Sequence, residues 1–236
     1  MPRDELTAAQ VREMFELLAQ HFDGVTQAQF AHDLAEKNRV ILLTRDERLV
    51  GFSTLLASTT AFEDEIIHMI YSGDTIVAPE AWGTTTLSRA WISAVNGWRA
   101  ELPEGRCFWL LLTSGFRTYR FLPVFWREFF PRFDRATPPE QQRLLNYLAS
   151  EQFGLQFDSQ RGLVRFQNPQ RLRAGLNQIP AGRANDPHIA FFAARNPGHA
   201  DGDELACLTE LCPENLTAAG RRMTTPQTCA PHCDHR

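Results

Sequence analysis

The chain has 236 residues, of which 43% are hydrophobic, so a folded core is expected and general disorder is not. The formal net charge of −4 disfavours a protein that binds nucleic acid by charge alone, because such proteins need clustered positive charge. No stretch approaches ~18 uninterrupted apolar residues, and the first ten residues lack the apolar core of a secretory signal. We therefore expect a cytoplasmic protein without a nucleic-acid or membrane partner.

The first half of the chain alternates between helical and strand patterns. Apolar residues recur at helical spacing from residue 7 onward, and Thr7 can cap that helix. Gly73 interrupts a long strand pattern, which indicates a bulge or a close approach of another group to the backbone. The predicted elements are helices at 7–22, 28–37 and 83–99, with strands at 39–44, 49–58, 65–77 and 106–114.

The second half of the chain has a different texture. Residues 115–130 form an aromatic-rich segment with a helical pattern, which Pro123 bends or breaks. An apolar run predicts a strand at 188–197, and helical spacing predicts a helix over 202–223. The other expected elements are a helix at 138–153, a strand at 162–168 and a loop at 169–187.

This order of elements predicts the fold class. Helices and strands alternate, and the hairpin at 39–58 favours antiparallel pairing. The helix at 83–99 joins two strands and so provides one parallel step. We expect an α/β (α+β) fold with a mixed, mostly antiparallel central sheet flanked by helices.

Gly83 lies between a strand-like run and the start of a predicted helix. The first N–H groups of a helix have no partner within it and carry the positive end of the dipole, so such a junction can bind an anion. Gly83 would let the backbone approach that anion, and Thr84, Thr85 and Thr86 would add hydroxyl donors. A plain tight turn explains the glycine equally well.

The run TIVAPEAWGTTTL (75–87) resembles the acyl-coenzyme A loop of the GNAT superfamily of N-acetyltransferases. That family carries Arg/Gln-x-x-Gly-x-Gly/Ala at this place, usually after Val-x-Pro-Glu. The hairpin at 40–55 is similar to the family's second and third strands, and the resemblance covers roughly residues 7–130. The matching positions are the central Gly83 and the lead-in residues Val77, Pro79 and Glu80.

Two motif positions depart from the family pattern. Glu80 stands where the family has Arg or Gln, and it places negative charge near an expected pyrophosphate site. Thr85 is bulkier than the family's Gly or Ala and narrows the approach. Three readings therefore remain: a free acyl-CoA donor, an acyl group on an acyl carrier protein, or a non-catalytic binding module on the same fold.

The resemblance implies an acyltransferase that moves an acetyl or other acyl group from coenzyme A to a small-molecule amine by direct attack. The fourth and fifth strands would splay apart around the pantetheine arm. A backbone N–H at the bulge of the fourth strand would polarise the thioester carbonyl. The implied cofactor-binding residues are Thr75, Ile76, Val77, Trp82, Gly83, Thr84, Thr85 and Thr86.

The resemblance also implies a general base on the fourth strand, for which the candidates are Asp74, Tyr71 and His68. His68 titrates near neutral pH intrinsically, whereas Asp74 needs burial to raise its pKa. Asp74 and His68 share the alternation of the strand unless the bulge changes it. Tyr119 is the candidate acid for the leaving thiolate. Each residue has an equally good structural explanation, as a core aromatic, a turn residue or a hydrogen-bonded histidine.

Three segments are expected along the chain. Residues 1–135 would form the GNAT-like acyl-CoA-binding core. Residues 136–223 would complete the sheet and supply elements of the acceptor site, and residues 224–236 would form a flexible tail. An acidic group could attract a cationic amine, or else cap the following helix; its members are Asp201, Asp203 and Glu204.

The remaining polar and cysteine-containing groups suggest three minor expectations. A carrier-protein donor would require a basic surface near Arg117, Arg120 and Arg127. Lys37 is the only lysine, so a Schiff-base mechanism would have a single candidate. No metal is expected, because structural zinc sites use two separated ligand pairs, whereas here the candidate ligands crowd together in the tail: Cys229, His232, Cys233 and His235.

Overall fold

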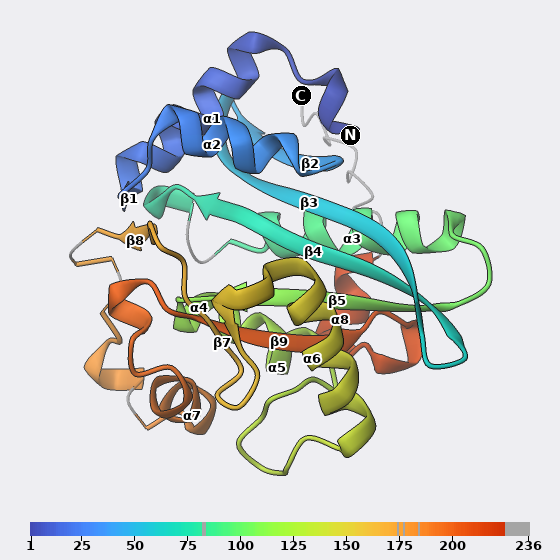
Figure 1. The fold of residues 1–236 in the computed structure, drawn as a ribbon. Coiled ribbons are helices and arrows are strands. Elements are labelled where there is room, and N and C mark those ends of the chain that lie inside the picture. Colours follow the sequence, from blue (N-terminus) through green and yellow to red (C-terminus); the bar gives the residue numbers. More distant parts are fainter. Residues whose placement is uncertain (82–83, 174, 177, 184, 225–236) are drawn as a thin grey trace, which may run out of the picture.

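The computed structural model describes residues 1–81, 84–173, 175–176, 178–183 and 185–224. Within these residues, seven strands form one sheet in the order β2-β3-β4-β5-β9-β7-β6, and helices cover both of its faces (Figure 1). Neighbouring strands pair antiparallel except β4 and β5, which are parallel. The predicted fold class, including its one parallel step, is confirmed.

The strands of the sheet come from both halves of the chain. β1 and β8 form a separate two-stranded pair within the described residues. The bounds are β1 (Phe22–Asp23), β2 (Arg39–Arg45), β3 (Arg48–Phe62), β4 (Glu65–Val77), β5 (Arg106–Thr113), β6 (Phe157–Asp158), β7 (Leu163–Val164), β8 (Arg171–Leu172) and β9 (Glu204–Glu210).

The helices form two layers, one on each face of the sheet. One face is covered by α1 (Ala8–His21), α2 (Gln27–Ala35) and α6 (Pro139–Phe153). The other face is covered by α3 (Thr86–Glu101), α4 (Phe116–Tyr119), α5 (Phe121–Phe125), α7 (Pro187–Arg195) and α8 (Ala218–Thr224). Short 3-10 turns lie at Arg3–Glu5, Pro79–Ala81, Gly154–Gln156, Ala181–Arg183, His199–Asp201 and Pro213–Asn215.

Helix α1 begins where the sequence predicts. The Thr7 side chain accepts a hydrogen bond from the Gln10 N–H at 3.2 Å, and the Gln10 side chain accepts one from the Thr7 N–H at 2.9 Å. This reciprocal pair satisfies two N–H groups that the helix itself cannot. The apolar face of the helix, which includes Met14 and Leu18, then packs against the sheet.

Two predicted elements in the C-terminal half are wrong. The expected strand at 188–197 is helix α7: Asp186 accepts hydrogen bonds from the first helical N–H groups, and Pro187 occupies the first turn. The expected helix at 202–223 begins with strand β9 and ends with helix α8. β9 lies between β5 and β7 and is buried on both faces, so it shows no alternation, and its mixture of apolar and small residues also fits helical spacing.

β4 carries a bulge where its glycine indicated one. Ser53 of β3 pairs with Thr75 and Leu55 pairs with Ser72, so Gly73 and Asp74 together stand opposite one residue. The parallel pairing of β4 with β5 ends just before the bulge, at Ser72 opposite Leu111. Beyond this point β4 continues to Val77 alongside β3 alone. β4 and β5 therefore splay apart, as expected of the fourth and fifth strands along the chain.

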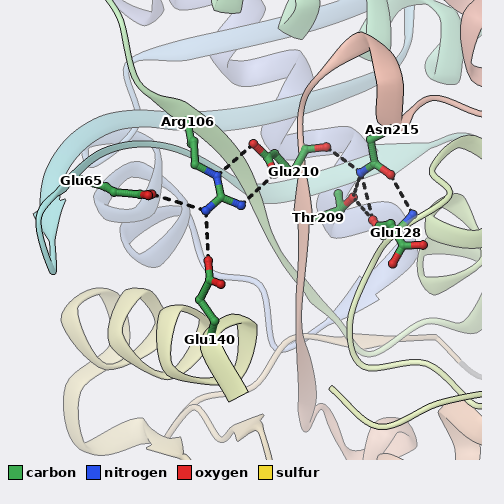
Figure 2. A network of polar contacts seen from close by, with 7 residues as sticks. All are labelled: Glu65, Arg106, Glu128, Glu140, Thr209, Glu210 and Asn215. Carbon is green, nitrogen blue, oxygen red and sulfur yellow. Dashed lines mark hydrogen bonds and ion pairs between the residues drawn. The ribbon is translucent and has the colours of Figure 1, made fainter. Parts of the chain in front are cut away.

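At the end away from this gap, the starts of β4 and β5 are joined by a network of charged side chains centred on Arg106 (Figure 2). Arg106, the first residue of β5, contacts Glu65 at the start of β4 at 3.4 Å and Glu210 at the end of β9 at 3.0 Å. It also contacts Glu140 on α6 at 3.1 Å. The network holds three strands and a helix together at this end, so the separation of β4 and β5 is confined to the other end.

Asn215 extends the same region of polar contacts (Figure 2). Its amide donates to the backbone oxygens of Glu128 and Glu210 at 3.0 and 2.8 Å and to the Thr209 hydroxyl at 3.1 Å. Its carbonyl oxygen accepts a hydrogen bond from the Glu128 N–H at 2.7 Å. The buried amide thereby fixes the end of β9 to the segment after α5.

Candidate active site

A cavity of about 950 Å³ opens where β4 and β5 separate. On the α3 face its lining includes Ser88 and Trp109, and on the α2 and α6 face it includes Lys37, Asp74 and Glu204. The cavity therefore connects the two faces of the sheet through the gap between the strands. Its volume is that of a typical small-molecule site.

The N-terminus of α3 lies at this cavity. Within the described residues of the junction, the cap residue Thr85 makes no side-chain cap hydrogen bond, and the first turn contains no acidic residue. Thr84 lines the cavity, and its hydroxyl donates to the Ala81 carbonyl at 2.9 Å. The first N–H groups of this long helix can thus receive an anion. Trp82 and Gly83, which the resemblance places here, lie outside the described residues.

Beyond the bulge, the backbone N–H and C=O groups of alternate β4 residues point toward the gap between β4 and β5. The Ala78 N–H donates to the Val50 carbonyl at 2.9 Å, which directs the backbone of Ala78, and also that of Ile76, toward β3. The backbone groups of Thr75 consequently point toward the gap that β5 leaves. Thr75, Ile76 and Val77 all line the cavity.

Asp74 lines the cavity from the bulge itself. Burial and, to a lesser extent, the charge of the nearby Asp33 raise the pKa of its carboxyl to about 6. Lys37 and a hydrogen bond with Gln170 act in the opposite direction. A carboxyl of this kind is ionised at neutral pH and is basic enough to accept a proton from an amine.

Glu204 is a second carboxyl of the cavity. It is the first residue of β9, and burial together with the charge of Asp74 raises its pKa to about 8. At neutral pH Glu204 therefore retains its proton while Asp74 is charged. The sequence pointed to Glu204 only within an acidic group. Asp203, another member of this group, forms an ion pair with Arg165 at 2.9 Å. The group caps no following helix, because strand β9 follows it instead.

Tyr71 lies next to these carboxyls. It lines the cavity, and its ring packs edge-on against Phe153 with 5.3 Å between centroids. Burial raises the pKa of its hydroxyl well above its usual value, and the charges of Glu204 and Asp74 add to the rise. Tyr71 is therefore a neutral hydrogen-bond donor at the site.

The other two catalytic candidates lie away from the cavity. His68 is buried; its Nε2 donates to the Pro103 carbonyl at 3.2 Å, and its Nδ1 accepts from the Thr59 hydroxyl at 2.9 Å. Tyr119 is buried in the core, and its hydroxyl donates to the Pro131 carbonyl at 3.0 Å. These contacts fit the structural explanation of both residues.

Two of the three arginines expected at a carrier-protein surface have partners within the protein. Arg120 forms an ion pair with Asp186 at 3.3 Å, and Arg117 donates to the Leu176 carbonyl at 2.8 Å. Arg127 is exposed.

Two further features concern only the described part of the chain. No group of three His, Cys, Asp or Glu residues in it could hold a metal ion. No helix in it is long and apolar enough to cross a membrane. The crowded candidate ligands of the tail lie outside the described residues: Cys229, His232, Cys233 and His235.

Residues 3–105 match the family model described as an acetyltransferase (GNAT) domain. No match was found among curated proteins. Similar solved structures include a GCN5-related N-acetyltransferase from Anabaena variabilis, with 12% identity and a TM-score of 0.40. That alignment covers 50% of this chain and only 30% of the Anabaena protein.

Two other solved structures align over most of this chain. One is a GCN5-related N-acetyltransferase from Kribbella flavida, with 11% identity, a TM-score of 0.40, and coverage of 89% of this chain and 65% of that one. The other is an aminoglycoside 6'-N-acetyltransferase complexed with coenzyme A, with 9% identity and a TM-score of 0.39. This alignment covers 90% of the present chain and 97% of the aminoglycoside enzyme.

Proposed function

Because residues 3–105 match the family model of an acetyltransferase (GNAT) domain, we propose that the protein is an acyl-CoA-dependent N-acyltransferase with a small-molecule amine as acceptor. One observation carries the proposal. The pairing of β4 with β5 ends at Ser72 and Leu111, and the cavity that opens there reaches from the N-terminus of α3 to Asp74.

The donor would span the cavity from one face of the sheet to the other. Its phosphates would accept hydrogen bonds from the first N–H groups of α3 and from Thr84. The pantetheine arm would pass between the separated strands. The Thr75 N–H, which points to the gap, would donate to the thioester carbonyl oxygen and stabilise negative charge there as the amine attacks.

Asp74 would act as the general base. The amine nitrogen forms a bond to the thioester carbonyl carbon, the carbon–sulfur bond breaks, and the proton lost by the amine passes to the Asp74 carboxylate. The departing thiolate takes a proton, and the protonated Glu204 and the neutral Tyr71 hydroxyl are the donors that line the cavity. Burial supplies the raised pKa that Asp74 needs for this role.

The acceptor would be an amine because the acceptor side of the cavity is acidic. Asp33 and Asp74 line it together with Glu204, which is neutral at pH 7. An acceptor arriving as an ammonium ion is attracted by the ionised carboxylates. It releases one proton to water before it attacks and gives the second to Asp74 as the amide forms. A carrier-protein donor and a non-catalytic module remain the two alternatives to this proposal.

A calorimetric titration with coenzyme A and acetyl-CoA tests the donor site. The variant Thr86→Glu places a negative charge in the first turn of α3, where it favours the helix but repels a phosphate. Thr86 is exposed, so the substitution is not expected to disturb packing, and Thr86→Gln is the uncharged control of matched size. We expect wild type and Thr86→Gln to bind, and Thr86→Glu to bind at least tenfold more weakly without a lower melting temperature.

The alternatives give different titration results. No binding of either ligand to wild type at millimolar concentration would rule out the free-CoA donor. Equal binding by both variants would place the phosphates away from α3. Binding of coenzyme A without thioester consumption by any amine tested would favour a non-catalytic module.

A further inference from the structure

The only lysine of the chain lies in the wall of the cavity. Lys37 is 5% exposed, and its Nζ donates to the backbone carbonyl of Asp33 at 3.0 Å. The same ammonium lies 5.3 Å from the centre of the Tyr71 ring, within the range of a cation–π interaction. A buried ammonium is costly unless its surroundings compensate for the lost water, so its position here requires an explanation.

The glycine of the β4 bulge provides the space for this side chain. A Cβ at Gly73 would lie 2.6 Å from Lys37 Cε and 3.5 Å from Lys37 Nζ. It would also lie 2.9 Å from Thr54 Oγ1. The lysine stem therefore lies directly on the backbone of the bulge, beside Asp74. This is the close approach that a glycine in the strand pattern indicated.

We propose that Lys37 is a positioning residue whose ammonium holds the Asp74 carboxyl in its ionised form, ready to take the proton of the acceptor amine. The proposal rests on the proposed function, because it assigns Lys37 a part in the reaction of Asp74. Lys37 itself need not touch the substrate. It acts through its charge at the bulge, where the lysine stem is pressed against Gly73.

The groups around Asp74 act in opposite directions. Burial and the charge of Asp33 disfavour the ionised carboxyl, whereas Lys37 and the hydrogen bond with Gln170 favour it. Tyr71 on β4 and Glu204 on β9 also face Asp74 across the cavity, and both are neutral at pH 7. Asp33 and Lys37 are therefore the two neighbouring charges that set the balance, and removing each one should shift the pKa of Asp74 in opposite directions.

An NMR titration of the Asp74 side-chain carboxyl carbon in the ligand-free protein tests this balance directly. The signal is assigned by its absence in Asp74→Asn. We expect a midpoint near pH 6 in wild type. Lys37→Met should raise it by about one pH unit or more, and Asp33→Asn should lower it. Asp33→Asn keeps the backbone carbonyl to which Lys37 donates, so it changes the charge with little change in geometry.

Lys37→Arg keeps the charge and should leave the midpoint close to that of wild type. A merely structural lysine would not give opposite shifts in Lys37→Met and Asp33→Asn. An unchanged midpoint in a folded Lys37→Met protein would overturn the proposal. Should Lys37→Met fail to fold, the Asp33→Asn and Lys37→Arg midpoints still decide: an unchanged midpoint in Asp33→Asn, or a raised one in a folded Lys37→Arg, would overturn it.

The titration needs no donor or acceptor, so its result is independent of the proposed function. The pH profile of kcat/KM then connects the titration of Asp74 to the proposed reaction. Lys37→Met should shift the acidic limb of the profile to higher pH. At pH values above that limb, the variant should recover much of the wild-type rate. A loss of the same factor at every pH would show a structural role instead. Failure of the proposed function would appear separately, as absent acetyl-CoA binding in wild type.

Discussion

Asp74 on β4 and Glu204 on β9 are two carboxyl groups of one cavity that hold opposite protonation states at neutral pH. Burial raises the pKa of Asp74 to about 6 and that of Glu204 to about 8, and the charge of Asp74 adds to the rise at Glu204. Two acidic groups whose environments separate their pKa values in this way can serve as base and acid in one reaction. Substitutions of Asp74 and of Glu204 test these two roles separately.

Asp74→Asn should remove the base while preserving the shape of the cavity. We expect kcat to fall by about 10²- to 10⁴-fold, the usual contribution of a general base. Coenzyme A binding should be unchanged, because the proposed donor contacts lie on α3 and beyond the bulge. In wild type, kcat/KM should fall as the pH decreases through about 6, since protonated Asp74 cannot accept a proton. Activity within threefold of wild type in Asp74→Asn would remove Asp74 from the mechanism.

Glu204→Gln should stabilise the protein at alkaline pH. The pKa of Glu204 is raised in the folded state from 4.5 to about 8, so its ionisation is disfavoured by folding. Wild type therefore loses stability from this group as the pH rises from about 4.5 through 8, and the variant does not. Each pKa unit corresponds to about 1.4 kcal/mol, so the rise from 4.5 to about 8 sets an upper bound of about 5 kcal/mol at pH 9. Solvent screening of the partly exposed side chain reduces this, and a gain of about 2 kcal/mol is expected. Urea unfolding at pH 9 and at pH 4.5 measures it, and an equal difference at both values would contradict the assignment.

Gly73→Ala tests the close packing of the β4 bulge. The added Cβ would lie 2.6 Å from Lys37 Cε, so the lysine must move, and a loss of about 1–3 kcal/mol is expected from overpacking. Gly97→Ala is the matched control: Gly97 lies in α3 with open space around its would-be Cβ. That variant should gain about 0.5–1 kcal/mol from helix propensity. Denaturant unfolding compares the two, and a stable Gly73→Ala protein with unchanged Asp74 titration would show that Lys37 does not depend on the glycine.

Arg106→Met should loosen the closed end of the sheet. Its loss leaves Glu65, Glu140 and Glu210 without their shared cation, and we expect about 1–2 kcal/mol of destabilisation, reduced by salt. Arg143→Met is the control, because Arg143 forms an exposed ion pair with Glu63 at 3.0 Å on the surface. An exposed pair of this kind is worth less than about 1 kcal/mol. Equal unfolding free energies for the two variants would mean that the network contributes no more than a surface pair.

The local elements of the fold could be predicted where pattern and turn chemistry agreed. The β4 bounds follow from the strand pattern of 65–77, and the start of α1 follows from Thr7. β9 was not recognised although β5, which is also buried on both faces, was. β5 carries an unbroken run of large apolar residues, whereas β9 includes Ala206, Cys207 and Thr209 and also fits helical spacing. The start of α7 was recognisable: Asp186 followed by Pro187 is a helix start signal, and the apolar run after it was given more weight.

The candidate site was harder to predict from the sequence than the elements of the fold. Asp74 and Tyr71 were predicted from one strand, and they lie on the same cavity. The bulge adds one residue to β4 and so breaks the alternation that would have put His68 on the same face of the strand as Asp74. Lys37 and Glu204 come from segments far apart in the sequence, and only the folded sheet brings them to Asp74. No local pattern carries that information.

A crystal structure with bound coenzyme A would test the central claim most directly. We expect the phosphates to lie at the first turn of α3 and the pantetheine arm to pass between β4 and β5 beyond Ser72 and Leu111, with the thiol near Asp74. Coenzyme A bound elsewhere on the protein, with the gap between these strands empty, would contradict it.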